Sequence, residues 1–199
     1  NKLESLEISA KNLSDLDTLP PLPKLRTLTV RECSKIKDFS PLTIQKELAF
    51  LEMWGCKYLT ILDFLSDLVN LRSVKISSLD DDRYHGITLD LHPLIKSPKI
   101  HTIDLAFNNT ATDFSPLAKL PNLENIHLRK IHSIKNLQAL AEVKKIKEIH
   151  LEDVNSPIDL SILGNLPELK SIILDGCNNI NNPDFFDGNE KVKVTISSG

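Results

Sequence analysis

Residues 100–105 read IHTIDL, residues 123–128 read LENIHL and residues 146–151 read IKEIHL. The three stretches share one apolar pattern, Leu-x-x-Leu-x-Leu, in which Ile, Val or Met can replace Leu. Matching stretches begin at Leu3, Leu25, Leu48, Leu71 and Leu169, and a weaker copy begins at Lys191. The spacing is 22 or 23 residues, apart from a single spacing of 29. A period of this length predicts a stack of small units rather than one globular core.

Each unit divides into a strand and a return segment. The last two apolar positions of the motif are two residues apart, which is the alternation of a strand with one buried face. The return segment reads DFSPL at Asp38–Leu42 and again at Asp113–Leu117. We expect Ser115 to cap a short helix or 3-10 turn, with Pro116 in the first turn. Strands on one side and wider helical turns on the other predict a curved stack.

The motif is that of leucine-rich repeats, and the chain resembles that superfamily along essentially its whole length. The resemblance implies an α/β solenoid, a curved right-handed horseshoe with a parallel β-sheet on its concave side and short helices or 3-10 turns on its convex side. The repeat length is similar to that of the internalins and of phosphatase-regulating leucine-rich proteins. Cys33 and Cys56, in VRECSKI and WGCKYLT, resemble the Cys-containing turns of plant immune receptors and some bacterial effectors. Cys177 takes the same ninth position of its repeat, where Asn108 stands in another.

The repeats predict one domain over residues 1–199, with about nine repeats and a C-terminal cap over residues 181–199. Residue 1 is Asn, and the first repeat begins at Leu3 without a capping segment, so we expect an upstream piece to be missing. The repeat that begins at Leu71 is six residues too long, and the surplus falls around residues 79–86, LDDDRYHG. Both a binding loop and a tolerated surface insertion fit this segment. Its consecutive Asp residues lack the spacing of a calcium-binding loop.

Bulk composition limits the classes of partner. The 199 residues are 41% hydrophobic and carry a net charge of −3. Since this charge gives no basic field, a nucleic acid is not an expected partner. No apolar run approaches the roughly 20 residues that cross a bilayer, so no membrane partner is expected. The three cysteines sit at repeat positions and favour reduced thiols in a cytosol, either that of the cell itself or that of a host reached by a secreted effector.

Side chains between the apolar positions face outward and form rows across the predicted sheet. Phe50 and Trp54 belong to one strand, with Arg26, Arg31 and Arg72 on the strands beside it. Aromatic residues and arginine dominate the energetics of protein interfaces, although single exposed apolar residues are also ordinary. The predicted partner-binding residues are Phe50, Trp54, Arg31, Arg72, Phe107, Arg129, Glu52, Lys75, Asp104 and His127.

The middle row carries Glu52, Lys75, Asp104, His127 and His150. Charges of alternating sign favour a ladder of cross-strand ion pairs. The two histidines and Asp104 also fit a zinc-like site or a pH-sensitive patch. Because side chains on neighbouring strands run parallel and no second shell is evident, we expect no metal and no cofactor.

Catalytic motifs are missing from the sequence, which has no Gly-x-Ser-x-Gly, no phosphate-binding glycine loop, no Cys-x-x-Cys and no His-Glu-x-x-His. We therefore expect a monomeric, non-enzymatic module that binds a protein on its concave face. The resemblance implies the same role, found among bacterial effectors and immune receptors. Two alternatives stay open. One is the recognition arm of a larger enzyme, a ligase or kinase-like receptor whose catalytic domain lies outside this chain, and the other is a self-associating scaffold.

Overall fold

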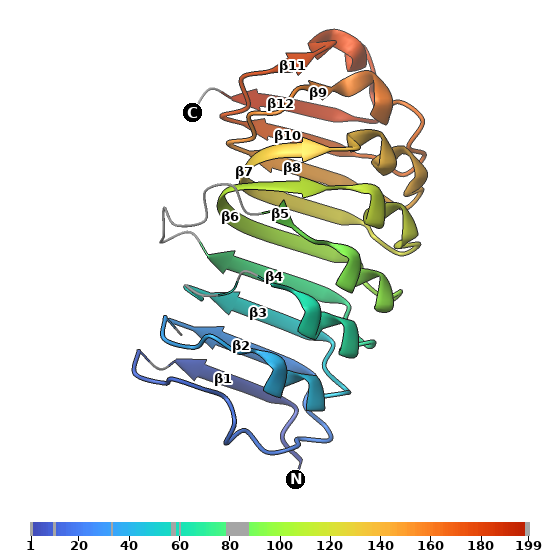
Figure 1. The fold of residues 1–199 in the computed structure, drawn as a ribbon. Helices are drawn as coiled ribbons and strands as arrows, with labels where there is room; N and C mark the ends of the chain where they lie inside the picture. The colour runs from blue at the N-terminus through green and yellow to red at the C-terminus, as the bar shows by residue number, and fades with distance from the viewer. Residues whose placement is uncertain are drawn as a thin grey trace.

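A parallel β-sheet with one strand from each repeat is the main element of the computed structural model (Figure 1). The structure describes residues 2–9, 11–32, 34–56, 59, 61–78 and 88–197, without the side chains of residues 78, 88, 107–110 and 132. The strands of the main sheet are β1 (Ser5–Ser9), β2 (Thr27–Arg31), β3 (Phe50–Trp54), β4 (Ser73–Ser78), β5 (Thr88–Leu89), β6 (Thr102–Asp113), β7 (Asn125–Lys135), β8 (Glu148–Glu152), β10 (Ser171–Asp175) and β12 (Lys193–Ser197). They follow chain order across the sheet, except that β5 pairs only with β6, while β9 (Ile158–Asp159) and β11 (Ile180–Asn181) form a separate pair.

Neighbouring strands pair one repeat apart. Ser5 pairs with Thr27, Thr27 with Phe50 and Phe50 with Ser73. The same register crosses the longest repeat, because Ser73 pairs with Thr102. The extra residues of that repeat therefore leave the rows of the sheet unbroken.

The apolar residues of the motif fill one continuous interior. In β2, Leu28 and Val30 have no exposed surface, whereas Arg31 of the same strand is exposed. Burying a side chain such as Leu28 stabilises the fold by about 1.5–3 kcal/mol. The same alternation recurs in β3, β8 and β10, whereas the end strands β1 and β12 are more exposed. A stack of units with a shared core is confirmed.

Short 3-10 helices line the side of the stack opposite the main sheet (Figure 1). They are η1 (Ser40–Ile44), η2 (Asp63–Asp67), η4 (His92–Lys96), η5 (Ser115–Lys119), η6 (Leu137–Glu142), η7 (Leu160–Leu163) and η8 (Pro183–Phe186). Prolines at the start of η1, η4, η5 and η8 suit the first turn, where no N–H is needed. The expected convex side of short helices or 3-10 turns is thus made of 3-10 turns in the described part of the chain.

The start of η5 differs from the sequence prediction, because Asp113 rather than Ser115 is the hydrogen-bond acceptor. One carboxylate oxygen of Asp113 accepts from the backbone N–H of Ser115 at 2.8 Å and from its hydroxyl at 2.6 Å. The same oxygen accepts from the side chain of Asn136, one repeat further on, at 2.9 Å. Donation by the Ser115 hydroxyl and N–H and by Asn136 lowers the pKa of Asp113 to about 2. The carboxylate two residues before the serine is therefore the group that fixes the turn.

Two strands are longer than the motif predicts. β6 and β7 continue past the first turn and pair again further along, where Thr110 lies opposite Ile131 and Asp113 opposite Lys135. Their pairing shifts between Ala106 and Thr110, as at a β-bulge. Together with β5 and the β9–β11 pair, these extensions make short parallel segments that lead into the 3-10 helices.

Backbone with positive φ marks the eighth position of several repeats, just after the strand or, at Lys130, within the longer strand β7. Glu32, Lys130 and Asp153 have φ of 53°, 55° and 53°, and Gly55 and Gly176 have φ of 65° and 62°. A non-glycine residue pays about 1–2 kcal/mol in this region, so the turn must be held by its neighbours.

Some predicted residues lie outside the described parts of the structure. They are Cys33, the insertion at 79–86, and the side chains of Phe107 and Asn108. The remaining cysteines, Cys56 and Cys177, are buried as expected. Burial raises the pKa of the Cys177 thiol, which suits packing rather than nucleophilic chemistry.

Candidate functional site

The outward rows of the main sheet lie in the register that the repeats predict. Glu52 pairs with Lys75, Lys75 with Asp104, Asp104 with His127, and His127 with His150. The row that contains Trp54 runs from Ser9 to Asp175 in the same manner. The exposed face of the sheet is therefore a regular grid of side chains from every repeat.

The two aromatic residues of β3 stand at opposite ends of that strand. Phe50 is 46% exposed, whereas Trp54 is half-buried, and its indole Nε1 has no hydrogen-bond partner among the described atoms. Four residues of strand separate their Cα atoms by about 13 Å. Each aromatic residue therefore lines a hollow of its own.

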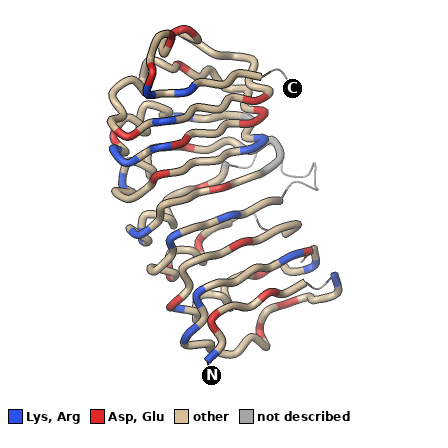
Figure 2. Tube along the Cα trace, turned by 180° about the vertical axis from the view of Figure 1, so that it is seen from behind, with Lys and Arg blue, Asp and Glu red and all other residues tan. Residues whose placement is uncertain are grey.

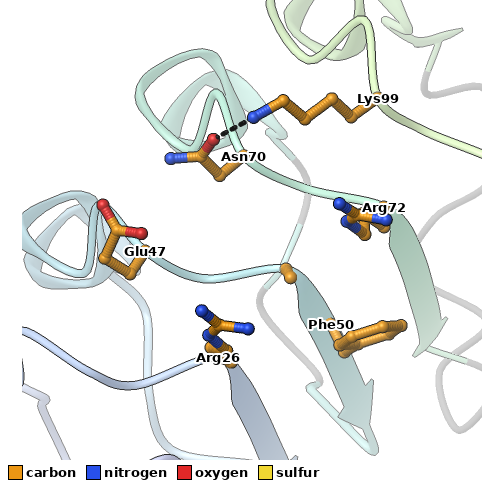
Figure 3. Close-up of a pocket in the computed structure, with 7 residues that line it drawn as sticks. Arg26, Glu47, Phe50, Asn70, Arg72 and Lys99 are labelled. Carbon is orange, nitrogen blue, oxygen red and sulfur yellow. Dashed lines mark hydrogen bonds between the residues drawn. The ribbon is translucent and has the colours of Figure 1, made fainter.

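The first hollow, called here the Arg26–Arg72 hollow, lies at the end of the strands where β3 begins (Figure 3). It has a volume of about 430 Å³. Its lining residues are Arg26, Glu47, Ala49, Phe50, Asn70, Arg72 and Lys99. The ammonium of Lys99 donates to Oδ1 of Asn70 at 2.7 Å, which holds one wall of the hollow in place.

The second hollow, called here the Trp54 hollow, lies where β3 ends and has a volume of about 530 Å³. Its lining residues are Lys11, Arg31, Glu32, Ser34, Trp54 and Gly55. The charged side chains that line this hollow already form ion pairs. Arg31 Nε lies 2.9 Å from Oε1 of Glu7, and Lys11 Nζ lies 3.7 Å from Oε2 of Glu32. This hollow therefore offers mainly the partly exposed face of Trp54 to a partner.

The middle row is a ladder of charged pairs, as the sequence predicted. Lys75 Nζ lies 3.4 Å from Oε1 of Glu52, and Arg129 Nη2 lies 3.5 Å from Oδ1 of Asp104. His127 Nδ1 lies 3.6 Å from Oδ2 of the same aspartate. Burial raises the pKa of Asp104, but His127, Arg129 and Lys75 outweigh it and hold that pKa below its usual value. The row is thus a connected network rather than a set of free charges.

His127 and His150 stack face to face, with ring centroids 4.0 Å apart and an interplanar angle of 4°. Ligand atoms of His127, His150 and Glu152 all lie within 4.8 Å of one another, a spacing that a metal ion could draw together. However, the nitrogen lone pairs lie in the ring planes, so stacked rings aim them side by side rather than at one point. Binding an ion would require both rings to turn. The arrangement shown is a stacked pair of imidazoles.

The pKa of His150 lies below its ordinary value, because burial and the adjacent His127 disfavour its charged form. Glu152, Glu148 and Asp175 act in the opposite direction and only partly offset this. The unfolded chain therefore binds a proton at His150 more readily than the folded protein does. The contribution of His150 to the free energy of unfolding is complete above its unfolded pKa of about 6.5. It is lost as the pH falls through the lower pKa of the folded protein.

We expect His150→Gln to flatten the pH dependence of stability. Urea unfolding of the wild type at pH 7.5, 6.5 and 5.5 should show a falling free energy of unfolding, and the decline should be shallower in the variant. Equal slopes for both proteins would contradict the assignment to His150. A nuclear magnetic resonance titration of the histidine ring protons provides the direct check.

No protein-family model and no curated protein matches the sequence. Among solved structures, internalin C2 of Listeria monocytogenes aligns with 97% of this chain and 80% of its own, with a TM-score of 0.71 and 20% identity. The chain has the leucine-rich-repeat fold.

Two larger structures with the leucine-rich-repeat fold also match. The Toll–Spätzle complex of Drosophila aligns with 98% of this chain at a TM-score of 0.54 and 19% identity. A complex of TLR13 with the single-stranded RNA ssRNA13 aligns with 88% of this chain at a TM-score of 0.55 and 14% identity. This chain spans only 30% and 29% of those two proteins. These identities show the fold alone, and the fold occurs with both protein and nucleic-acid ligands.

Several residues of the two hollows were not predicted from the sequence to bind a partner. They are Glu47, Ala49, Asn70 and Lys99 in the Arg26–Arg72 hollow and Lys11, Glu32, Ser34 and Gly55 in the Trp54 hollow. The usable signal was the second position of each leucine-rich repeat, which reads Arg26, Ala49 and Arg72 in three successive units. A small residue between two long ones leaves space at the surface.

No helix in the described ranges is long and apolar enough to cross a membrane.

Proposed function

We propose that this leucine-rich-repeat chain is a binding module for a protein partner that lies across the exposed face of its main sheet. The observation that carries the proposal is Phe50, a large aromatic side chain 46% exposed on a largely polar sheet face. Trp54 on the same strand and the arginines beside them add the residue types that concentrate binding energy in protein interfaces. The two hollows give the partner places for protruding side chains.

The charge pattern of the face favours a protein over a nucleic acid. Lys and Arg residues are interleaved with Asp and Glu residues along the stacked strands (Figure 2). The ladder through Glu52, Lys75 and Asp104 is close to neutral, and the whole chain carries a net charge of −3. A phosphate backbone needs a continuous basic track, which such a ladder does not supply. A protein with its own mixed charges meets this surface more readily.

The test is a double substitution on β3, Phe50→Ala with Trp54→Ala. After affinity capture and mass spectrometry identify a partner, the double variant should bind it about 30-fold more weakly, equivalent to about 2 kcal/mol. The matched control is Ile61→Ala with Val69→Ala, two exposed apolar residues outside the strands of the sheet. That control should bind with wild-type affinity.

Because Trp54 is half-buried, folding must be measured alongside binding. A far-ultraviolet circular dichroism melt of each variant separates lost contacts from lost structure. Undiminished binding by a folded double variant would reject the aromatic pair as the centre of the interface. Equal weakening by the control pair would move the interface to the other side of the stack, and capture of a nucleic acid alone would exclude a protein partner.

A further inference from the structure

The Arg26–Arg72 hollow exists because an alanine stands between two arginines on successive strands (Figure 3). The backbone N–H of Ala49 donates to the carbonyl of Arg26 at 2.8 Å, and that of Arg72 donates to the carbonyl of Ala49 at 2.7 Å. The three residues are therefore direct neighbours across the sheet. Ala49 is 9% exposed and lines the hollow together with Phe50.

Within the described part of the chain, the guanidinium groups at the rim have no acidic partner. Neither Arg26 nor Arg72 makes a side-chain hydrogen bond or an ion pair with any described residue, although both side chains are exposed. This distinguishes them from Arg129, which lies 3.5 Å from a carboxylate oxygen of Asp104. Lys99 adds a third positive charge to the lining, and Glu47 is the single carboxylate among the residues that line the hollow. The hollow thus carries an excess of positive charge in a protein whose net charge is negative.

The spacing of the arginines indicates what shape of anion fits. Arg26 and Arg72 are two strands apart, which separates their Cα atoms by about 10 Å. Alternate side chains of an extended peptide lie about 7 Å apart, and two flexible arginine side chains can close that difference. A guanidinium binds a carboxylate with two parallel hydrogen bonds, so each arginine suits one acidic side chain.

We infer that the Arg26–Arg72 hollow binds an acidic, extended segment of the protein partner, with carboxylates on alternate residues and an apolar side chain against Phe50. The inference rests on the proposed function and names the chemistry of the partner at this site. Charge complementarity is the argument for this occupant, since two unpaired guanidiniums beside an exposed ring match two carboxylates beside an apolar group. A single phosphoryl group would concentrate its charge at one point between the arginines and leave the ring uncovered.

The test is a titration of the whole ¹⁵N-labelled chain with three probes, followed by nuclear magnetic resonance. The probes are the peptide acetyl-Glu-Ser-Glu-Ser-Leu-amide, its counterpart acetyl-Gln-Ser-Gln-Ser-Leu-amide, and phenyl phosphate. In an extended peptide of this sequence, the two acidic side chains and the leucine point to the same side. The Glu peptide should produce saturable shifts at the amides of Ala49 and Phe50 and at the Nε–H of Arg26 and Arg72. Its affinity should exceed that of the Gln peptide by about tenfold or more and should fall as salt is added.

The variant Arg26→Gln with Arg72→Gln should weaken the Glu peptide by about tenfold or more, since both charge-assisted contacts are removed. Both side chains are exposed, and the amide spectrum will verify the fold. The matched control Lys119→Gln changes an exposed cation in η5, outside both hollows, and should leave peptide binding unchanged.

Three outcomes would overturn the inference. They are equal binding of the Glu and Gln peptides, tighter binding of phenyl phosphate than of the Glu peptide, and unchanged binding in the Arg26→Gln, Arg72→Gln variant. If one of these occurs while the Phe50→Ala, Trp54→Ala change still weakens partner capture, the proposed protein-binding function stands. Only the acidic segment is then rejected. If the peptide binds as expected but the Phe50→Ala, Trp54→Ala variant captures the partner as well as the wild type does, the proposed function fails instead.

Discussion

Replacing Phe114 by alanine is expected to lower the free energy of unfolding by about 3–5 kcal/mol. Phe114 has no exposed surface and is the largest of the fully buried side chains among the described residues. It stands immediately before η5, between the inner apolar rows and the 3-10 helices. Removing its ring leaves a cavity in the continuous core, and the lining side chains lose their dispersion contacts. Since each repeat is stabilised by its neighbours, the loss weakens the stack on both sides.

Urea unfolding followed by circular dichroism measures this effect, with Phe50→Ala as the matched control. The control removes the same ring from a site that is 46% exposed, so its unfolding free energy should change far less. A loss below about 1 kcal/mol for Phe114→Ala would mean that the core collapses around the cavity. Equal losses at the two sites would contradict the division into core and binding face.

Replacing Gln45 by leucine is expected to cost about 1–3 kcal/mol, because a buried backbone N–H loses its acceptor. Gln45 is 1% exposed, an unusual place for a polar side chain. Its Oε1 accepts from the N–H of Leu22 at 3.0 Å, and its Nε2 donates to the carbonyl of Pro20 at 3.0 Å. The side chain thus ties the first return segment to the next repeat. Leucine fills a similar volume but offers neither an acceptor nor a donor.

Amide hydrogen exchange gives the sharpest measurement, since the Leu22 amide should exchange faster in the Gln45→Leu variant than in the wild type. The matched control is Gln138→Leu, the same change at an exposed residue. It should alter neither the exchange of Leu22 nor the urea midpoint. A Gln45→Leu protein as stable as the wild type would show that the apolar replacement compensates for the lost hydrogen bonds.

The repeat period made the sheet predictable from the sequence. Once the motif is aligned, each outward residue has a fixed neighbour, so the row from Glu52 to His150 could be written down before any coordinates. The return segment was less predictable. Asp, Ser and Pro all favour the start of a helical turn, and the letters DFSPL do not say which side chain accepts the hydrogen bond. The structure assigns that role to Asp113.

The candidate site was predicted in composition but not in shape. Spacing places Phe50 and Trp54 on one strand, but exposure at a strand end depends on how the chain enters and leaves the sheet. Trp54 is half-buried, whereas Phe50 is exposed. The Arg26–Arg72 hollow depends on the small size of Ala49 rather than on any functional residue type. Sequence motifs are defined by reactive or charged residues, so the space that a small residue leaves between two long side chains is easily missed.

The unchanged register between β4 and β6 has an evolutionary consequence. A length change in one unit is absorbed within that unit, and the strands on either side keep their partners. Whole units can therefore be duplicated, lost or exchanged between proteins without redesigning the remainder. Recognition on such a scaffold can be rewritten one strand at a time.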